Sequence, residues 1–139
     1  MKKHYRWILM TPLVAFAALL GRHQAARADE VSQEDLQRWQ AQFMSTVEVG
    51  RVLWTDGKLG TNGVTCAQCH PNATDTHPET YPKFQKQLGR VVLLWEMINW
   101  CLRNPLEGKA LAPDDRGMIA LQAYMTYERR GVPLDPGKH

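Results

Sequence analysis

The sequence predicts a small all-α domain. Three stretches place apolar residues three or four positions apart, which is the spacing of one face of a helix, and no segment alternates as a strand would. The chain has 139 residues, a length typical of one domain. We therefore expect a few helices packed around one thin core.

The first 28 residues are expected to be an export signal. A basic start precedes an apolar run over residues 7–20, and residues 26–28 have the small-x-small pattern that signal peptidase recognises. The alternative, an uncleaved membrane anchor, is disfavoured because a spanning helix needs roughly 20 apolar residues and this run is shorter. We expect cleavage after Ala28, a mature domain of residues 29–139 without a stable membrane span, and a periplasmic location.

Signal removal changes the charge of the protein. The signal holds five of the 17 basic residues and none of the 14 acidic ones, so the net charge falls from +3 for the whole chain to −2 for residues 29–139. The remaining charges of both signs are scattered and form no basic cluster. A nucleic-acid-binding domain would carry such a cluster, so we exclude nucleic acid as a partner.

The first predicted helix runs from Ser32 to Trp54. Ser32 and Asp35 have the spacing of a capping box, in which side chains bond the free N–H groups of the first turn. Apolar or small residues then recur every three or four positions: Leu36, Trp39, Phe43, Val47, Gly50 and Trp54. This pattern indicates an amphipathic helix, which a glycine-containing loop over residues 55–64 follows.

Two more helices are predicted after a polar, proline-containing loop over residues 71–82. One runs from about Leu88 to Arg103 and ends at Asn104-Pro105. Its apolar side is formed by Val91, Leu94, Trp95, Ile98, Cys101 and Leu102. The last helix begins at Asp114-Asp115 and stops at Arg129-Arg130-Gly131, so that acids lead and bases close it, as the helix dipole favours.

The motif Cys66-Ala67-Gln68-Cys69-His70 has the C-x-x-C-H spacing of covalent haem attachment. Two thiols three positions apart can bond the two vinyl groups on one porphyrin edge, and the next residue offers an imidazole to the iron. A zinc site would need four ligands, and a redox C-x-x-C would need a βαβ context that is missing. We expect one haem c on Cys66 and Cys69, with His70 as the proximal ligand.

With this motif, the chain resembles the class I cytochrome c superfamily. The similarity includes residues 50–54 before the motif and Leu121, Ala123 and Tyr124 in the last helix, where that family crosses its terminal helices. The resemblance implies a class I cytochrome c-like helical domain wrapped around one covalent haem. It also implies that Gly50 packs against an aromatic side chain of the last helix, Tyr124 or Tyr127.

The distal iron ligand has several candidates: Cys101, Met97, Met118, Met125 and His77. Thiolate, thioether and imidazole groups all bind haem iron, and the residues alone leave the choice open. Cys101 is favoured because it is a third, unpaired cysteine in an oxidising compartment and lies on the inner face of a predicted helix. Met97 shares that face, and His77 is expected to make local hydrogen bonds in its loop.

A narrower resemblance is to the haem domains of thiosulfate dehydrogenases and of SoxA, the A subunit of the Sox thiosulfate-oxidising cytochrome. The residues that carry it are Tyr81-Pro82, Ile98, Cys101, Arg103, Gly108-Lys109-Ala110-Leu111, Asp114, Met118 and Ala123-Tyr124. In those domains the haem is His/Cys-ligated. The resemblance therefore implies that Cys101 is the distal ligand and that Met118 belongs to the core.

This chain departs from the pattern of those domains in two ways. They carry an arginine one helical turn before the ligating cysteine, where it can hold a sulfur oxyanion, whereas this chain has Met97 there. Arg103 and Arg90 are possible substitutes outside the family position. The chain also has one C-x-x-C-H motif where the dehydrogenase has two haems, so electrons would leave through a redox partner protein, such as another cytochrome subunit.

The sequence thus predicts a periplasmic electron carrier, or a redox subunit rather than a stand-alone enzyme. One-electron transfer would occur at low potential, because an axial thiolate stabilises ferric iron. Four tryptophans of the mature chain are expected to keep the haem edge dry: Trp39, Trp54, Trp95 and Trp100. The alternatives are a haem subunit of an enzyme that oxidises inorganic sulfur compounds, and a module that binds a diatomic gas.

Overall fold

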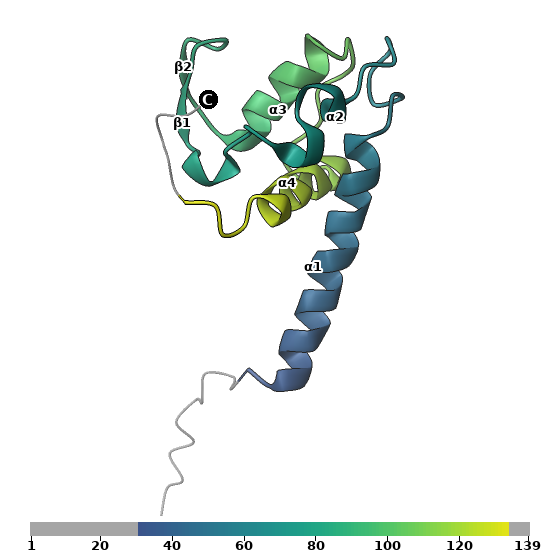
Figure 1. The fold of residues 1–139 in the computed structure, drawn as a ribbon, viewed down its shortest axis with the longest axis vertical. Coiled ribbons are helices and arrows are strands. Elements are labelled where there is room, and N and C mark those ends of the chain that lie inside the picture. Colours follow the sequence, from purple (N-terminus) through teal and green to yellow (C-terminus); the bar gives the residue numbers. More distant parts are fainter. Residues whose placement is uncertain (1–30, 134–139) are drawn as a thin grey trace, which may run out of the picture. The chain divides into compact units, whose positions relative to one another are not determined.

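A computed structural model describes residues 31–133, and the expected signal peptide, residues 1–28, lies outside them. Its elements, in chain order, are α1 (Gln33–Trp54), α2 (Cys66–Cys69), η1 (Pro71–Ala73), η2 (Pro78–Thr80), β1 (Lys83–Gln85), β2 (Arg90–Val92), α3 (Leu94–Arg103) and α4 (Arg116–Glu128), where η denotes a short 3-10 turn (Figure 1). The predicted all-α fold is confirmed. None of the helices in the described part is long and apolar enough to cross a bilayer.

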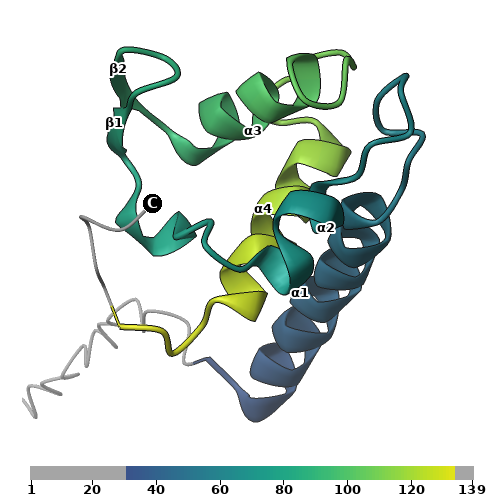
Figure 2. The same cartoon turned by 45° about the horizontal axis from the view of Figure 1, so that its top comes forward.

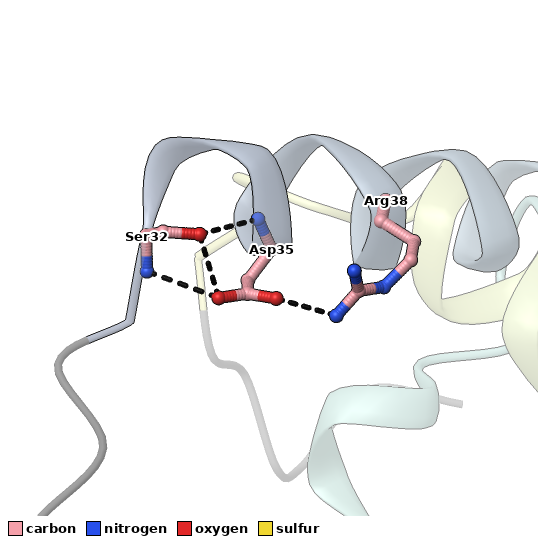
Figure 3. A network of polar contacts seen from close by, with 3 residues as sticks. All are labelled: Ser32, Asp35 and Arg38. Atoms are coloured by element: carbon pink, nitrogen blue, oxygen red, sulfur yellow. Dashed lines mark hydrogen bonds and ion pairs between the residues drawn. The ribbon is translucent and has the colours of Figure 1, made fainter.

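The start of α1 is fixed by the predicted capping box. The Ser32 hydroxyl accepts a hydrogen bond from the Asp35 N–H at 3.0 Å, and the Asp35 carboxylate accepts one from the Ser32 N–H at 3.2 Å (Figure 3). Arg38 pairs with the other carboxylate oxygen. Hydrogen bonds from Ser32, above all from its side chain, hold the pKa of the Asp35 carboxyl below its usual value.

The centre of the fold is the crossing of α1 and α4, which lie side by side in both views (Figures 1 and 2). Gly50 makes the crossing possible, because a Cβ atom there would lie 2.0 Å from the Ala120 carbonyl oxygen and 2.7 Å from Tyr124 Cβ. The predicted contact of Gly50 with an aromatic residue is therefore confirmed for Tyr124. Its ring also packs against Trp54, with the ring centroids 5.5 Å apart.

The N-terminal half of α1 is less buried than its sequence pattern suggests. Leu36 and Trp39 are 46% and 48% exposed, although they continue the apolar face that Val47 and Trp54 bury. The reason is that α4 covers the C-terminal half of the helix, whereas the first turns of α1 extend beyond it (Figure 1). The periodicity correctly predicted the helix but not the length of its buried face.

Residues 83–92 form a β-hairpin, which corrects the expectation that the chain has no strands. β1 and β2 pair antiparallel, with Lys83 opposite Val92, and Gly89 in the connecting turn has a φ of +65°. Each strand has three residues, which is too short to show the alternation of a strand in the sequence.

α3 begins at Leu94 and not near Leu88, so the second predicted helix was too long. The Glu96 carboxylate accepts a hydrogen bond from the Leu93 N–H at 2.8 Å, which caps the first turn. The apolar spacing of Leu88, Val91 and Leu94 suggested a continuous helix, but Val91 is 60% exposed on β2. The end of α3 at Arg103 and the extent of α4 agree with the prediction.

α3 is fastened to the following loop by a buried amide. Asn99 donates to the Leu111 carbonyl and accepts from the Leu111 N–H, both at 2.8 Å. Asn99 is buried, so these two bonds satisfy polar groups that would otherwise be costly to bury. They hold residues 110–112 against the side of α3 that carries Asn99.

Candidate haem site

The two thiols of the C-x-x-C-H motif lie on α2, a single helical turn. Thr65 precedes the turn in an extended conformation, and Gln68 Oε1 accepts a hydrogen bond from the Thr65 N–H at 3.0 Å. Side chains three residues apart share one face of a helix. The turn therefore presents Cys66 and Cys69 on the same side, and the chain leaves the helix at His70.

The His70 ring is oriented by the backbone that follows it. Its Nδ1 lies 2.8 Å from the Thr74 carbonyl oxygen, and because a carbonyl only accepts, Nδ1 must carry the proton. Asn72 and Ala73 adopt left-handed conformations that turn the chain back toward the ring. In this tautomer of the neutral ring, Nε2 carries the lone pair and is free to bind a metal ion.

His70 is also anchored through its main chain. The indole N–H of Trp54 donates to the His70 carbonyl oxygen at 2.9 Å, and Trp54 is buried against Tyr124. The side chain of Trp54 therefore connects the α1–α4 crossing to the C-x-x-C-H motif. A movement of this crossing would displace the imidazole.

These residues open onto a cavity of about 270 Å³. Its wall is mainly apolar and includes Leu94, Ile98, Trp100, Leu102, Leu106 and Met125. α2 contributes Cys66 and Cys69, α3 contributes Cys101, and residues 75–87 close another side. A pocket with apolar walls and few polar groups is typical of cofactor sites.

Most of the residues predicted for the haem site line this cavity. Cys66, Cys69, His70 and Cys101 line it, and so do Met97 and Met125. All three cysteines are unpaired.

Two of the predicted ligand candidates lie outside this lining. Met118 is fully buried in the helical core and is not part of the cavity wall. His77 is buried in its loop, where Nδ1 lies 3.0 Å from Glu79 Oε1 as part of the expected local hydrogen bonding.

The four tryptophans of the predicted mature chain lie in different surroundings. Trp54 and Trp100 line the cavity, as expected for side chains that exclude water from a cofactor. Trp95 lies on a different side of α3 and lines a separate cavity. Trp39 is exposed on the first turns of α1.

The buried thiols are electrostatically linked. Burial raises the pKa of the Cys66 thiol to about 12, and a negative charge on Cys101 adds to this shift. Burial likewise raises the pKa of Cys101 to about 11, with a further contribution from Cys69. Without a compensating cation, these thiols stay protonated at neutral pH, whereas a bound metal ion stabilises a thiolate.

The sequence did not predict that residues 81–87 place polar side chains at the cavity. Tyr81, Lys83 and Gln85 line it, and Gln85 Nε2 donates to the Tyr81 hydroxyl at 2.6 Å. Burial raises the pKa of Tyr81 to about 12, and the nearby Cys101 adds to the shift. No local signal predicted these groups, because the strand that carries Lys83 and Gln85 has three residues and is too short to show an alternation.

This donor set fits a covalently held haem. Two thiols on one helical face can attach such a cofactor, an imidazole with a free Nε2 can bind its iron, and the apolar wall suits the porphyrin; a further sulfur lies on α3. The comparisons with known proteins bear on the same question. The family model described as "SoxA/TsdA, cytochrome c domain" matches residues 49–134.

The chain belongs to this family of cytochrome c domains. It is 31% identical over 114 residues to the L-cysteine S-thiosulfotransferase subunit SoxA of Rhodovulum sulfidophilum, which covers 78% of this chain and 38% of that protein. It is also 31% identical to thiosulfate dehydrogenases of Allochromatium vinosum, over 85 residues, and of Psychrobacter arcticus, over 81 residues. Each match covers 52% of this chain, and 32% and 25% of the respective enzyme.

Membership of the SoxA/TsdA cytochrome c domain family implies a covalent haem c and a role in electron transfer. The predicted resemblance to these domains is confirmed. The chain spans between a quarter and two fifths of the length of these curated relatives. One of them is named as a subunit.

Proposed function

We propose that residues 29–139 form a periplasmic monohaem cytochrome c that carries out one-electron transfer. Haem c would be attached to Cys66 and Cys69, and its axial ligands would be His70 and Cys101. The observation that carries the proposal is the convergence of these four side chains on one cavity from α2, the α2 C-terminus and α3. When bound, the haem supplies an iron that exchanges one electron reversibly.

Each residue has a separate task in this proposal. The thiols of Cys66 and Cys69 attach the cofactor, and the hydrogen bond from Nδ1 to the Thr74 carbonyl fixes the His70 ring with Nε2 available. Trp100 and the aliphatic wall exclude water. The anionic ligand favours the ferric state, so we expect a low reduction potential.

Cys101 is preferred over Met97 and Met125, which line the same cavity. Its thiol lines the cavity together with the thiols of Cys66 and Cys69, and charges on these thiols interact. A cysteine without a disulfide partner keeps a thiol that can bind a metal ion as the thiolate. The methionines are then part of the apolar wall.

The location and partners belong to the same proposal. The basic start, apolar run and small-x-small pattern of residues 1–28 support export to the periplasm. The single C-x-x-C-H motif supports one haem. A chain with one haem must pass its electron to another redox protein, and the subunit name of the Rhodovulum relative supports a cytochrome partner.

A second function is favoured by the relatives, two of which are named thiosulfate dehydrogenases. In this case the chain would be the haem subunit of an enzyme that oxidises inorganic sulfur compounds. Haem reduction on addition of thiosulfate would distinguish it from simple electron transfer.

Replacing Cys101 with alanine is expected to remove the distal ligand without detaching the haem. Low-temperature electron paramagnetic resonance of the ferric wild type should show the compressed low-spin signal of thiolate ligation, and Cys101→Ala should lose it. The reduction potential of the variant should rise, because the iron then lacks the anionic ligand that favours its ferric state.

Met97→Ala and Met125→Ala are the matched controls, since both side chains line the same cavity. They should keep the thiolate signal. A His/Met signal that survives in Cys101→Ala and disappears in one methionine variant would refute Cys101 as the ligand. The protein would then be a cytochrome of higher potential.

A further inference from the structure

The first turns of α1 carry an exposed apolar stripe. Leu36, Trp39 and Phe43 follow one another at helical spacing and are 46%, 48% and 40% exposed. Farther along α1 the same face is buried at Val47 and Gly50, where α4 crosses it. Large aromatic and aliphatic side chains gathered on an exposed face are typical of a protein–protein interface. We call these three residues the α1 stripe.

The edges of the α1 stripe are rich in glutamine. The helical repeat places Gln37 and Gln40 along one edge and Gln42 along the other, whereas Glu34 and Arg38 lie on the back of the helix. A side-chain amide both donates and accepts hydrogen bonds, so it can face an identical amide. In a two-fold interface the same patch meets itself, and like charges there would repel. The edges therefore suit a second copy of the chain.

The two ends of the α1 stripe carry opposite charges. The first turn of α1 contains Glu34 and Asp35. At the other end, Phe43 packs against Tyr127 of α4, with the ring centroids 6.4 Å apart, and Arg130 Cζ lies 3.5 Å from the centre of the Tyr127 ring. The ion pairs within the described part of the chain include neither Glu34 nor Arg130. An antiparallel pairing of two stripes would therefore bring each acidic end to a basic one.

We propose that the α1 stripe docks on a second copy of this chain, with the two α1 helices antiparallel about a two-fold axis near Trp39. Leu36 of each copy then faces Phe43 of the other, and the acidic first turn of each lies beside Arg130 of the other. The first turns of α1 point away from α2 and α3 in both views, so each haem cavity stays accessible to a redox partner (Figures 1 and 2). The proposal does not depend on which residue is the distal iron ligand.

The size of the α1 stripe sets the expected strength of this dimer. A standard stable interface buries about 800 Å² on each partner. Three half-exposed side chains with their glutamine edges offer less than this area. The dimer should therefore be weak and reversible, with a dissociation constant of about 10–100 μM, and its population should rise with protein concentration.

The test is analytical ultracentrifugation of the holoprotein over a concentration series from about 1 μM to 1 mM. Wild type should show a reversible monomer–dimer equilibrium. Trp39→Gln should weaken the dimer by about tenfold or more, because a central aromatic side chain is lost from both copies. Arg130→Gln should weaken it by about threefold, the order of effect of exposed ion pairs.

Val49 provides the matched control. It is 51% exposed on the same helix, but the helical repeat places it on the side away from the α1 stripe. Val49→Gln should therefore leave the dissociation constant unchanged. Cross-linking tests the arrangement itself: Gln40→Cys lies next to the proposed two-fold axis and should form a disulfide-linked dimer under mild oxidation, whereas Val49→Cys should not exceed the background of wild type.

Several outcomes would overturn this inference. A wild type that stays monomeric at about 1 mM would refute it, as would equal weakening by Trp39→Gln and Val49→Gln. A dimer that persists in Trp39→Gln would show that another face is used. The haem spectrum of each variant should match that of wild type, because the α1 stripe is not part of the haem cavity. Loss of the dimer with an unchanged spectrum therefore supports the stripe as the interface and excludes misfolding as the cause.

Discussion

Joint replacement of Cys66 and Cys69 by alanine is expected to abolish covalent haem attachment. The two thiols are the groups on α2 that can form thioether bonds, and the remaining lining residues can hold a porphyrin only by coordination and packing. Haem staining after denaturing electrophoresis should be lost in the double variant. Each single variant should keep reduced staining through one thioether bond.

Cys101→Ala is the matched control for this experiment, because it removes a sulfur from the same cavity but no attachment point. It should stain like wild type. Covalent haem in the double variant would contradict the assignment of Cys66 and Cys69. We also expect the double variant to unfold at lower denaturant concentration, since a cofactor that binds only the folded state stabilises it.

Replacement of Gly50 by alanine is expected to destabilise the domain by about 3 kcal/mol or more, at the upper end of the cost of overpacking. The added Cβ would lie 2.0 Å from the Ala120 carbonyl oxygen, which is backbone and cannot rotate away. α1 and α4 would have to separate, and Trp54, which bonds the His70 carbonyl, would move with them. Chemical denaturation of the holoprotein measures the free energy of unfolding.

Gly117→Ala is the matched control, because Gly117 is also a helical glycine. A Cβ there would lie 3.0 Å from Asp115 Oδ1 and 3.5 Å from two leucine methyl groups, so its nearest neighbours are side-chain atoms and not backbone. Alanine is also the better helix former, so the variant should unfold within about 1 kcal/mol of wild type. Equal unfolding of the Gly50 and Gly117 variants would show that the crossing is not as tight as described. Gly50→Ala should in addition alter the ferric haem spectrum, whereas Gly117→Ala should not.

Local features of the sequence were sufficient for much of the fold. The capping box at Ser32, the end of α3 before Pro105 and the acidic N-terminus of α4, whose N-cap is Asp115, were predicted, because each depends on interactions within one turn. The family was also recognisable, since C-x-x-C-H is a local motif and the residues that resemble the family on both sides of Cys101 follow in a fixed order along the chain. Assignment of Cys66, Cys69, His70 and Cys101 as haem-binding residues stays a prediction.

The hairpin was not predictable, and it changed the description of the site. Three-residue strands are stabilised by their partner strand and not by their own composition, so Leu88 and Val91 could equally continue a helical repeat. Because the hairpin was not predicted, the sequence did not indicate that Lys83 and Gln85 lie near a cofactor. For the same reason, the sequence left Arg90 and Arg103 as candidates for binding a sulfur oxyanion. The structure shows that both line a separate cavity.

By itself, the sequence determined the helical class, the attachment motif and the set of candidate sulfur ligands, because these follow from spacing along the chain. Tertiary structure decided which of them share a cavity: Cys101, Met97 and Met125 line it, whereas Met118 lies in the core. It also decided that α1 is buried where α4 crosses it, and that Lys83 lines the cavity. These outcomes depend on contacts between segments far apart in the chain, whose geometry no local pattern encodes.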